Sequence, residues 1–155
     1  MPIALQVPWR SVTPAWTGQS VVFISRFDAT GLKARLRLFV GGIRLRRAVL
    51  ASPGALGVSL RARPIAGRYY TLSCWRDEAS LMTFAHGKDH RAVVRRVSQL
   101  GPVSGVLIAL EGSATRPRWR DVLGWVDSLE PGPYWRGDVG ALGGMKPAAE
   151  FRARS

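Results

Sequence analysis

His90 has the clearest capacity for chemistry in this sequence. In a helix predicted over residues 89–100, the spacing i, i+3, i+4, i+7 forms one apolar stripe from His90, Val93, Val94 and Val97. If this stripe faces a sheet, the imidazole points into the space between helix and sheet. A neutral imidazole in such a pocket is a good axial ligand for haem iron. The competing interpretation is a histidine that only hydrogen-bonds a backbone group near the start of a helix.

Other metal-binding or catalytic side chains are scarce. His86 is the second-choice haem ligand, because we expect Gly87 to end a helix and turn His86 toward solvent. The single cysteine, Cys74, excludes an internal disulfide and any cysteine-based metal cage, and we expect a buried, inert thiol. No dinucleotide-binding, Walker, zinc-protease or GxSxG motif occurs. Because few side chains in the sequence could bind a metal, the sequence fits haem, whose porphyrin itself supplies four nitrogen ligands to the iron.

Three arginines could hold an anionic group near this histidine. Arg61 and Arg63 share one face of a predicted strand, and Arg68 begins the next strand. Guanidinium groups bind carboxylates in bidentate geometry, so these side chains could hold haem propionates or an acidic substrate. A solvated strand face is the competing interpretation for each of them. Arg26 and Arg37 are weaker candidates for the same role.

Aromatic side chains could line a substrate pocket. In the strand predicted over 68–75, Tyr69 and Trp75 lie on one face and Tyr70 lies on the other with Cys74. One set should line the pocket beneath the helices and the other the opposite core. We take the pocket wall to be Tyr69, Trp75, Phe84 and Val94, although aromatic residues more often fill a core.

Alternating periods predict the elements that position these residues. Strands are expected over 20–27, 56–63, 68–75 and 103–111. Helices are expected from Thr30, a possible N-cap, to about 51, weakened at Gly41-Gly42, then from Asp77 to Gly87 and over 89–100. The first helix carries an apolar stripe of the kind that faces a core, made of Leu32, Leu36, Phe39, Val40 and Ile43. A further amphipathic helix is expected over 119–129.

The order β, α, β, β, α, β predicts an α+β, ferredoxin-like antiparallel sheet with both helices on one face and an appended C-terminal helix. The first and last strands are apolar at consecutive positions, so both of their faces should be buried. A partner sheet is the simplest cover for the second face, which predicts a homodimer. The alternative is a monomer in which the N-terminal arm and the appended helix cover that face.

The ends of the chain differ from its middle. We expect residues 1–19 to form an extended arm, 20–130 the folded domain with its appended helix, and 131–155 a Gly/Pro-rich, partly disordered tail. We expect no leader peptide, because the first residues lack a basic n-region. The apolar runs are too short to span a bilayer, so we expect a cytoplasmic protein with no membrane partner.

The net charge of +13 on 155 residues first suggests nucleic acid. However, residues 26–68 hold ten basic side chains and one acid, so nine of the thirteen net charges lie on the first helix and the hairpin. A local field of this kind suits an anionic ligand or an acidic partner better than a phosphate backbone. A nucleic-acid-binding sheet with exposed aromatics remains a less favoured alternative.

One block of residues resembles a known family. The stretch from Tyr70 through Ser73, Trp75 and Phe84, followed by His86 and His90-Arg91, resembles the antibiotic biosynthesis monooxygenase superfamily, as does the entry into strand two at 52–57. Among its branches the block is most similar to the spheroidene monooxygenase-like group, whose better-known member oxygenates carotenoids. The resemblance covers about residues 20–111 and implies a dimeric α+β barrel.

The superfamily includes cofactor-free oxygenases of electron-rich polyketide rings, haem-binding oxygenases and proteins without established activity. The resemblance therefore implies a small haem-binding monooxygenase of specialised metabolism, with an organic substrate between helices and sheet and haem on His90. A cofactor-free oxygenase and a non-catalytic barrel that binds a ligand or partner are the alternatives. The fold alone does not choose among them.

Overall fold

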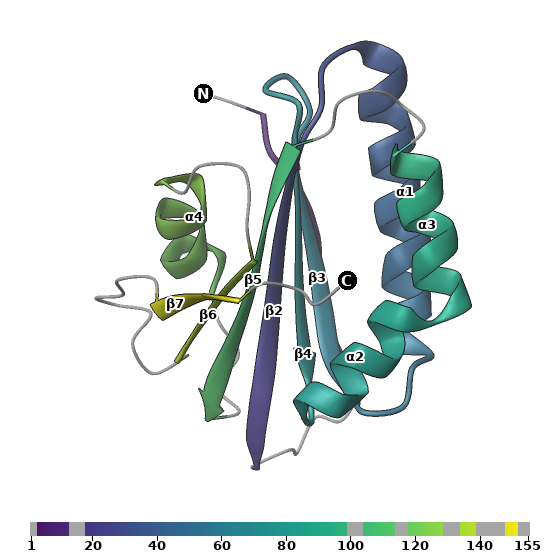
Figure 1. Cartoon of the computed structure of the whole chain (residues 1–155). Helices are drawn as coiled ribbons and strands as arrows, with labels where there is room; N and C mark the ends of the chain where they lie inside the picture. The colour runs from purple at the N-terminus through teal and green to yellow at the C-terminus, as the bar shows by residue number, and fades with distance from the viewer. Residues whose placement is uncertain are drawn as a thin grey trace.

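Four antiparallel strands form the centre of one sheet (Figure 1). The computed structural model describes residues 3–12, 18–98, 104–113, 118–128, 134–138 and 148–151. The central strands are β2 (Gln19–Asp28), β3 (Ala55–Arg63), β4 (Arg68–Trp75) and β5 (Ser104–Ser113), in the order β3-β4-β2-β5. This order and the helical crossovers confirm the predicted α+β, ferredoxin-like class.

Strand β2 is central because it can bury both of its faces. Val22 lies opposite Cys74 on β4 and Leu110 on β5. Val21, Val22 and Ile24 are all buried, as their consecutive apolar positions predict. Strand β2 therefore holds the two halves of the sheet together.

Helices lie on both faces of the sheet, as Figure 1 shows. On one face are α1 (Leu32–Leu50), α2 (Glu78–His86) and α3 (Lys88–Ser98), and on the other is α4 (Trp119–Ser128). Asp77 is the N-cap of α2, as predicted, because its Oδ1 accepts a hydrogen bond from the Ser80 amide at 2.7 Å.

One local expectation for the helices is wrong: the N-cap of α1 is Gly31, with φ of 85°, and not Thr30. Helix α1 continues through Gly41-Gly42, the pair expected to weaken it. Helix α2 ends at Gly87, as predicted, and this residue is extended, with φ of −71°, and leads directly into α3.

The orientation of α1 also differs from the prediction. The buried side chains are Ala34, Leu38 and Val49, whereas Leu32 and Leu36 are 84% and 62% exposed. The side toward the sheet also carries Gly42, where an added Cβ would make an ordinary contact of 3.7 Å with Leu60 Cδ1. The helix thus has two apolar faces, and the bulkier face points outward.

Beneath the three helices lies an apolar core. Trp75 is fully buried and its ring lies 5.0 Å from the Phe84 ring. Around it pack Val21, Val49, Ala55, Val58 and Leu81. This cluster joins β2, β3 and β4 to α1 and α2.

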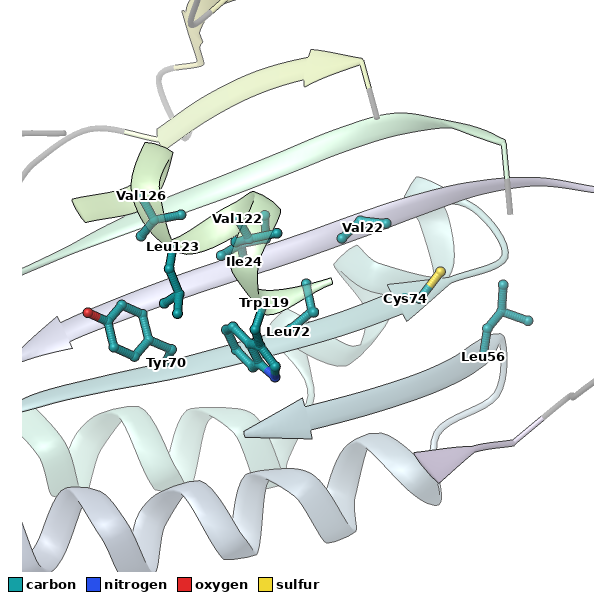
Figure 2. Packing of buried hydrophobic residues seen from close by; sticks show 10 residues of the cluster. All are labelled: Val22, Ile24, Leu56, Tyr70, Leu72, Cys74, Trp119, Val122, Leu123 and Val126. Atoms are coloured by element: carbon teal, nitrogen blue, oxygen red, sulfur yellow. The ribbon is translucent and has the colours of Figure 1, made fainter. Parts of the chain in front are cut away.

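A second core lies on the opposite face, beneath α4. Figure 2 shows Trp119 and Leu123 of α4 over Leu72 and Tyr70 of the sheet. Val122 and Val126 of α4 are fully buried in the same cluster. The appended helix predicted at 119–129 therefore exists and covers the second face; its Trp125 side chain and residue 129 lie outside the described residues.

The sheet extends beyond its four central strands at both edges. Strand β1 (Leu5–Ser11), within the predicted arm, pairs antiparallel with β3. Beyond β5 lie β6 (Tyr134–Asp138), parallel to it, and β7 (Ala148–Phe151). The other residues of 131–155 lie outside the described residues, so a partly disordered tail stays a prediction.

The elements that cover the face of the sheet opposite α1, α2 and α3 bear on the expected homodimer. Where we expected a partner sheet, the described residues place the chain's own α4, with the Trp9 side chain of β1 packed against the same cluster. This is the cover foreseen for a monomer. The homodimer stays a prediction, and its partner would have to contact α4 or a part of the sheet that α4 leaves open.

Candidate functional site

His90 lies where α2 and α3 meet. Its Nδ1 lies 2.8 Å from the Ala85 carbonyl oxygen, and its ring centroid lies 5.1 Å from that of Phe84. Phe84 in turn contacts Trp75. A continuous row of aromatic rings therefore fixes the half-buried imidazole to the core.

The environment of His90 favours a neutral imidazole with a defined tautomer. Burial lowers the pKa of His90, with a smaller effect in the same direction from the charge of His86; the Ala85 carbonyl acts in the opposite direction. A carbonyl oxygen only accepts hydrogen bonds, so Nδ1 must be the donor. The neutral ring then carries its lone pair on Nε2, which can accept a proton or bind a metal.

The imidazole lines a cavity of about 190 Å³, here called the His90 pocket. The α1–β3 loop contributes Ser52 and Pro53, and the other lining residues come from the α2–α3 corner: Ser80, Thr83, Phe84, Gly87, Lys88 and Asp89. Ser52 Oγ donates to the Ala48 carbonyl at 2.7 Å, and Thr83 Oγ1 donates to the Ala79 carbonyl at 2.8 Å. With their protons engaged in this way, both hydroxyl oxygens can accept hydrogen bonds from a ligand.

The predicted pocket wall is only partly present. Phe84 lines the His90 pocket. Tyr69 and Trp75 lie on the helix side of the sheet, as the alternation predicts, but both are core residues, 9% and 0% exposed. Val94 is 48% exposed and does not line the pocket.

His86 is exposed, as predicted. Its Nδ1 lies 2.8 Å from the Met82 carbonyl oxygen within α2. It is not among the residues that line the His90 pocket.

The arginines predicted to hold an anion lie on the opposite face of the sheet. Arg63 Nη1 lies 2.7 Å from Asp127 Oδ2, and Arg68 Nη1 lies 3.5 Å from Asp127 Oδ1. Asp127 also accepts a hydrogen bond of 2.6 Å from the Tyr70 hydroxyl. Arg61 donates to Gln6 Oε1 of β1 at 2.8 Å. These groups bind parts of the chain itself.

Arg26 completes this network. It is 2% exposed, and its Nη1 donates to the Val126 carbonyl of α4 at 2.7 Å. It also pairs with Asp28 at 3.3 Å. We call Arg26, Arg63, Arg68, Tyr70 and Asp127 the α4 clasp, because together they hold the C-terminal half of α4 on the sheet. Arg37, the other weak candidate, is exposed on α1.

The clasp also affects the Tyr70 hydroxyl. Burial, followed by the hydrogen bond to Asp127 and the negative charge of that carboxylate, raises the pKa of Tyr70 to about 12. Arg63 lies over the ring, 5.7 Å from its centroid. The phenol therefore stays protonated at neutral pH and serves as a donor to Asp127.

The residues predicted for haem do not form one haem site. His90 lies on the helix side of the sheet, whereas Arg61, Arg63 and Arg68 lie on the α4 side and bind Gln6 or Asp127. The cavity at His90, about 190 Å³, is also smaller than the roughly 300–1,000 Å³ of typical cofactor and drug-sized sites. This set of residues therefore does not fit a haem group.

A larger groove, which the sequence reasoning missed, lies beside α4. This α4 groove has a volume of about 590 Å³ and is lined by Gln6, Trp9, Ser59, Leu72, Arg118, Trp119 and Arg120. Trp119 Nε1 donates to Ser59 Oγ at 2.9 Å, which fixes one wall. The run Arg118-Trp119-Arg120 could have signalled it, but the contribution of β1 could not be foreseen.

Other chemistry finds little support among the described residues. Burial raises the pKa of the Cys74 thiol, in agreement with the inert thiol predicted. Within the described ranges, no cluster of three or more His, Cys, Asp or Glu side chains could hold a metal ion. None of the described helices is both long and apolar enough to cross a bilayer.

Comparison with known proteins identifies the fold. No protein-family model matches this sequence, and no curated protein does. Among solved structures, a candidate antibiotic biosynthesis monooxygenase from Deinococcus radiodurans matches with a TM-score of 0.56 and 13% identity, over 63% of this chain and 97% of that chain. SnoaB, a cofactor-independent oxygenase from Streptomyces nogalater, matches with a TM-score of 0.50 and 17% identity, over 66% and 98%.

A third match concerns a longer protein. A candidate monooxygenase from Fusobacterium nucleatum has a TM-score of 0.53 and 9% identity over 63% of this chain, which spans 45% of that chain's length. The fold is thus that of the antibiotic biosynthesis monooxygenase-like proteins, as the resemblance predicted. The spheroidene monooxygenase-like branch stays a prediction.

Proposed function

We propose that this chain is a monooxygenase-like enzyme that binds part of an organic substrate in the His90 pocket and uses His90 as a proton acceptor, without haem on that residue. The observation that carries the proposal is the imidazole itself. Its Nδ1 is held by the Ala85 carbonyl, its ring lies against Phe84, and burial lowers its pKa. Such a ring is neutral at pH 7 and ready to take a proton.

The size of the pocket limits what enters it. A cavity of about 150 Å³ accommodates benzene, so a pocket of about 190 Å³ holds one ring of a substrate. Phe84 offers an aromatic wall, and Ser52 and Thr83 offer hydroxyl oxygens. A phenolic or enolisable ring satisfies all of these groups and has a proton to give.

The reaction balances without a cofactor if the substrate supplies the electrons. His90 removes a proton from the ring, and the resulting anion adds dioxygen to form a hydroperoxide after His90 returns the proton. Loss of water then leaves a carbonyl group, so that one CH₂ and one O₂ become one C=O and one H₂O. The residues of the pocket contribute proton transfer and orientation.

Dioxygen consumption with a panel of hydroxylated polycyclic aromatic ketones tests this proposal. His90→Gln should lower kcat by about 10²–10⁴-fold, the usual value of a positioned base, whereas His86→Gln should leave kcat unchanged. Full activity in His90→Gln would refute the role of His90. A Soret band in the purified protein that shifts in His90→Ala would instead restore haem, and with it the expectation from the spheroidene branch.

Nucleic-acid binding through the sheet finds no support in the described residues. A sheet that binds nucleic acid needs aromatic side chains on an open face, but those of β4 are buried: Tyr69, Tyr70 and Trp75 are 9%, 2% and 0% exposed.

If the protein is instead a non-catalytic barrel, it should bind a ligand from the same panel of ketones without turnover. Cytoplasmic location and specialised metabolism stay predictions.

A further inference from the structure

The outward side of α1 carries an apolar stripe that belongs to none of the core clusters formed by the described residues. Four large side chains, here called the outer stripe, recur at i, i+4, i+7 and i+8: Leu32, Leu36, Phe39 and Val40. They are 84%, 62%, 41% and 42% exposed. Scattered exposed apolar residues are ordinary, but a continuous row along one side of a helix marks an interaction surface.

Positive charges border the outer stripe on both sides. With about 100° between successive residues of a helix, the exposed Lys33, Arg37 and Arg44 lie along one border. The half-buried Arg35 and Arg46 lie along the other, where Arg35 Nη1 donates to the Pro64 and Ile65 carbonyls. Residues 32–50 include no Asp or Glu. Beside α1, α3 adds the exposed Arg91, Arg95 and Arg96. The layer of two helices therefore combines apolar contact area with a concentrated positive field.

We propose that the outer stripe and its arginine borders form a docking surface for an anionic lipid bilayer. A helix with Leu and Phe on one side and arginines at its borders lies in the plane of the membrane interface, with the apolar side chains among the acyl chains. The guanidinium groups reach the phosphates along their apolar stems. Such a contact is peripheral and needs no membrane-spanning helix.

A second copy of the chain fits this surface less well. Two copies that met along α1 would place one set of arginines against the other, with no acid on either helix to balance them. A partner therefore has to be negatively charged.

The shape of the surface favours a membrane over an acidic peptide. Both cavities described above are elsewhere: one at the α2–α3 corner and one beside α4. A peptide docks best in a groove, whereas the exposed side of α1, about 28 Å long for its 19 residues, can lie along a flat bilayer.

Vesicle co-sedimentation tests the proposal. The full-length protein should bind mixed phosphatidylcholine–phosphatidylglycerol vesicles at low salt and lose most of this binding at high salt or on pure phosphatidylcholine vesicles. Arg37→Gln/Arg44→Gln should weaken binding by about 30-fold, because each basic residue near an anionic surface contributes about fivefold. Leu36→Asn/Phe39→Asn should weaken it by at least about tenfold.

Arg118→Gln/Arg120→Gln is the matched control. It removes the same charge from exposed side chains on the other face of the sheet and should change binding by less than about twofold. Thermal unfolding of each variant checks that it keeps the fold of the parent protein. If the double apolar variant does not fold, Leu32→Asn, at the most exposed position of the stripe, takes its place.

Four results would overturn the proposal. The protein could fail to bind the anionic vesicles at low salt, or the apolar variants could bind as well as the parent protein, which would leave only electrostatic adsorption. Polyglutamate could bind with the same dependence on both sets of variants, which would indicate an acidic protein partner. Sedimentation equilibrium could show a dimer that only the apolar variants dissociate, which would indicate a second copy.

Discussion

The two faces of the sheet are covered in different ways. On the helix side, α1 and α2 pack through apolar side chains around the fully buried Trp75, and a pocket remains at the α2–α3 corner. On the opposite face, one helix of ten residues is held both by an apolar cluster and by the α4 clasp. The charged side chains Arg26, Arg63 and Arg68 of the sheet thus hold α4, while His90 remains available for chemistry.

The difference reflects the size of the covering elements. A helix of about ten residues is marginal by itself and buries only part of its surface, so apolar contact alone specifies its orientation weakly. Directed hydrogen bonds from Arg26 to the Val126 carbonyl and from Tyr70 to Asp127 fix its position. On the other face, the 19-residue helix α1 packs through apolar side chains and is bonded to the β3–β4 turn through Arg35, which donates to the Pro64 and Ile65 carbonyls.

Removal of Trp75 should have the largest effect on stability. Trp75→Ala leaves a cavity among Val21, Ala55 and Phe84 and should lower the free energy of unfolding by about 3–5 kcal/mol. Urea denaturation followed by circular dichroism measures this. The control Val94→Ala, at a position 48% exposed, should change it by less than about 0.5 kcal/mol. A loss below about 1 kcal/mol in Trp75→Ala would contradict the core we describe.

Disruption of the α4 clasp should have the next largest effect, confined to the other face. Asp127→Ala removes the acceptor of Tyr70 and the partner of Arg63, and should cost about 2 kcal/mol, because these partly exposed charges stay partly solvated. Amide hydrogen exchange should accelerate in α4 and remain unchanged in α2.

Two further variants sharpen the comparison. Asp89→Ala removes the same charge at an exposed position in the first turn of α3 and should cost less than about 1 kcal/mol. Tyr70→Phe should add almost nothing to Asp127→Ala, because the two changes remove one shared hydrogen bond. Additive losses, or faster exchange in α2, would show that the clasp does not act locally.

Much of this fold was predictable from the periodicity of the sequence. The four central strands and the appended helix lie where runs or periodic spacing of apolar residues predicted them. The orientation of α1 was not predictable in this way. That helix has two apolar sides, and the side with Ala34 and Leu38 is the one that packs on the sheet.

The candidate site was predictable only in part. The position of His90 at the edge of an apolar stripe indicated a pocket on the helix side, and the structure places it there. The role of Arg63 depends on Asp127, which lies 64 residues away on a helix whose docking no local pattern encodes. Sequence spacing shows which strand face an arginine occupies, but not which acid it meets.

His90 should also make the free energy of unfolding depend on pH, and this effect should be smaller than those above. Its pKa in the folded protein is lower than the ordinary 6.5, so the unfolded chain takes up a proton first as the pH falls through 6.5. The free energy of unfolding should therefore decrease with falling pH until the folded form also protonates. His90→Gln should remove this contribution from the stability measured in denaturation curves as the pH is lowered from 7. An unchanged slope would contradict a buried, neutral His90.

Nitrogen NMR of the imidazole rings tests the central claim most directly, because the sequence contains two histidines and the His86→Gln variant leaves only His90. We predict that His90 carries its proton on Nδ1 at pH 7, bonded to the Ala85 carbonyl, and that it titrates below 6.5. An imidazole that titrates at or above 6.5, or that carries its proton on Nε2, would contradict the assignment of His90 as the base of the pocket.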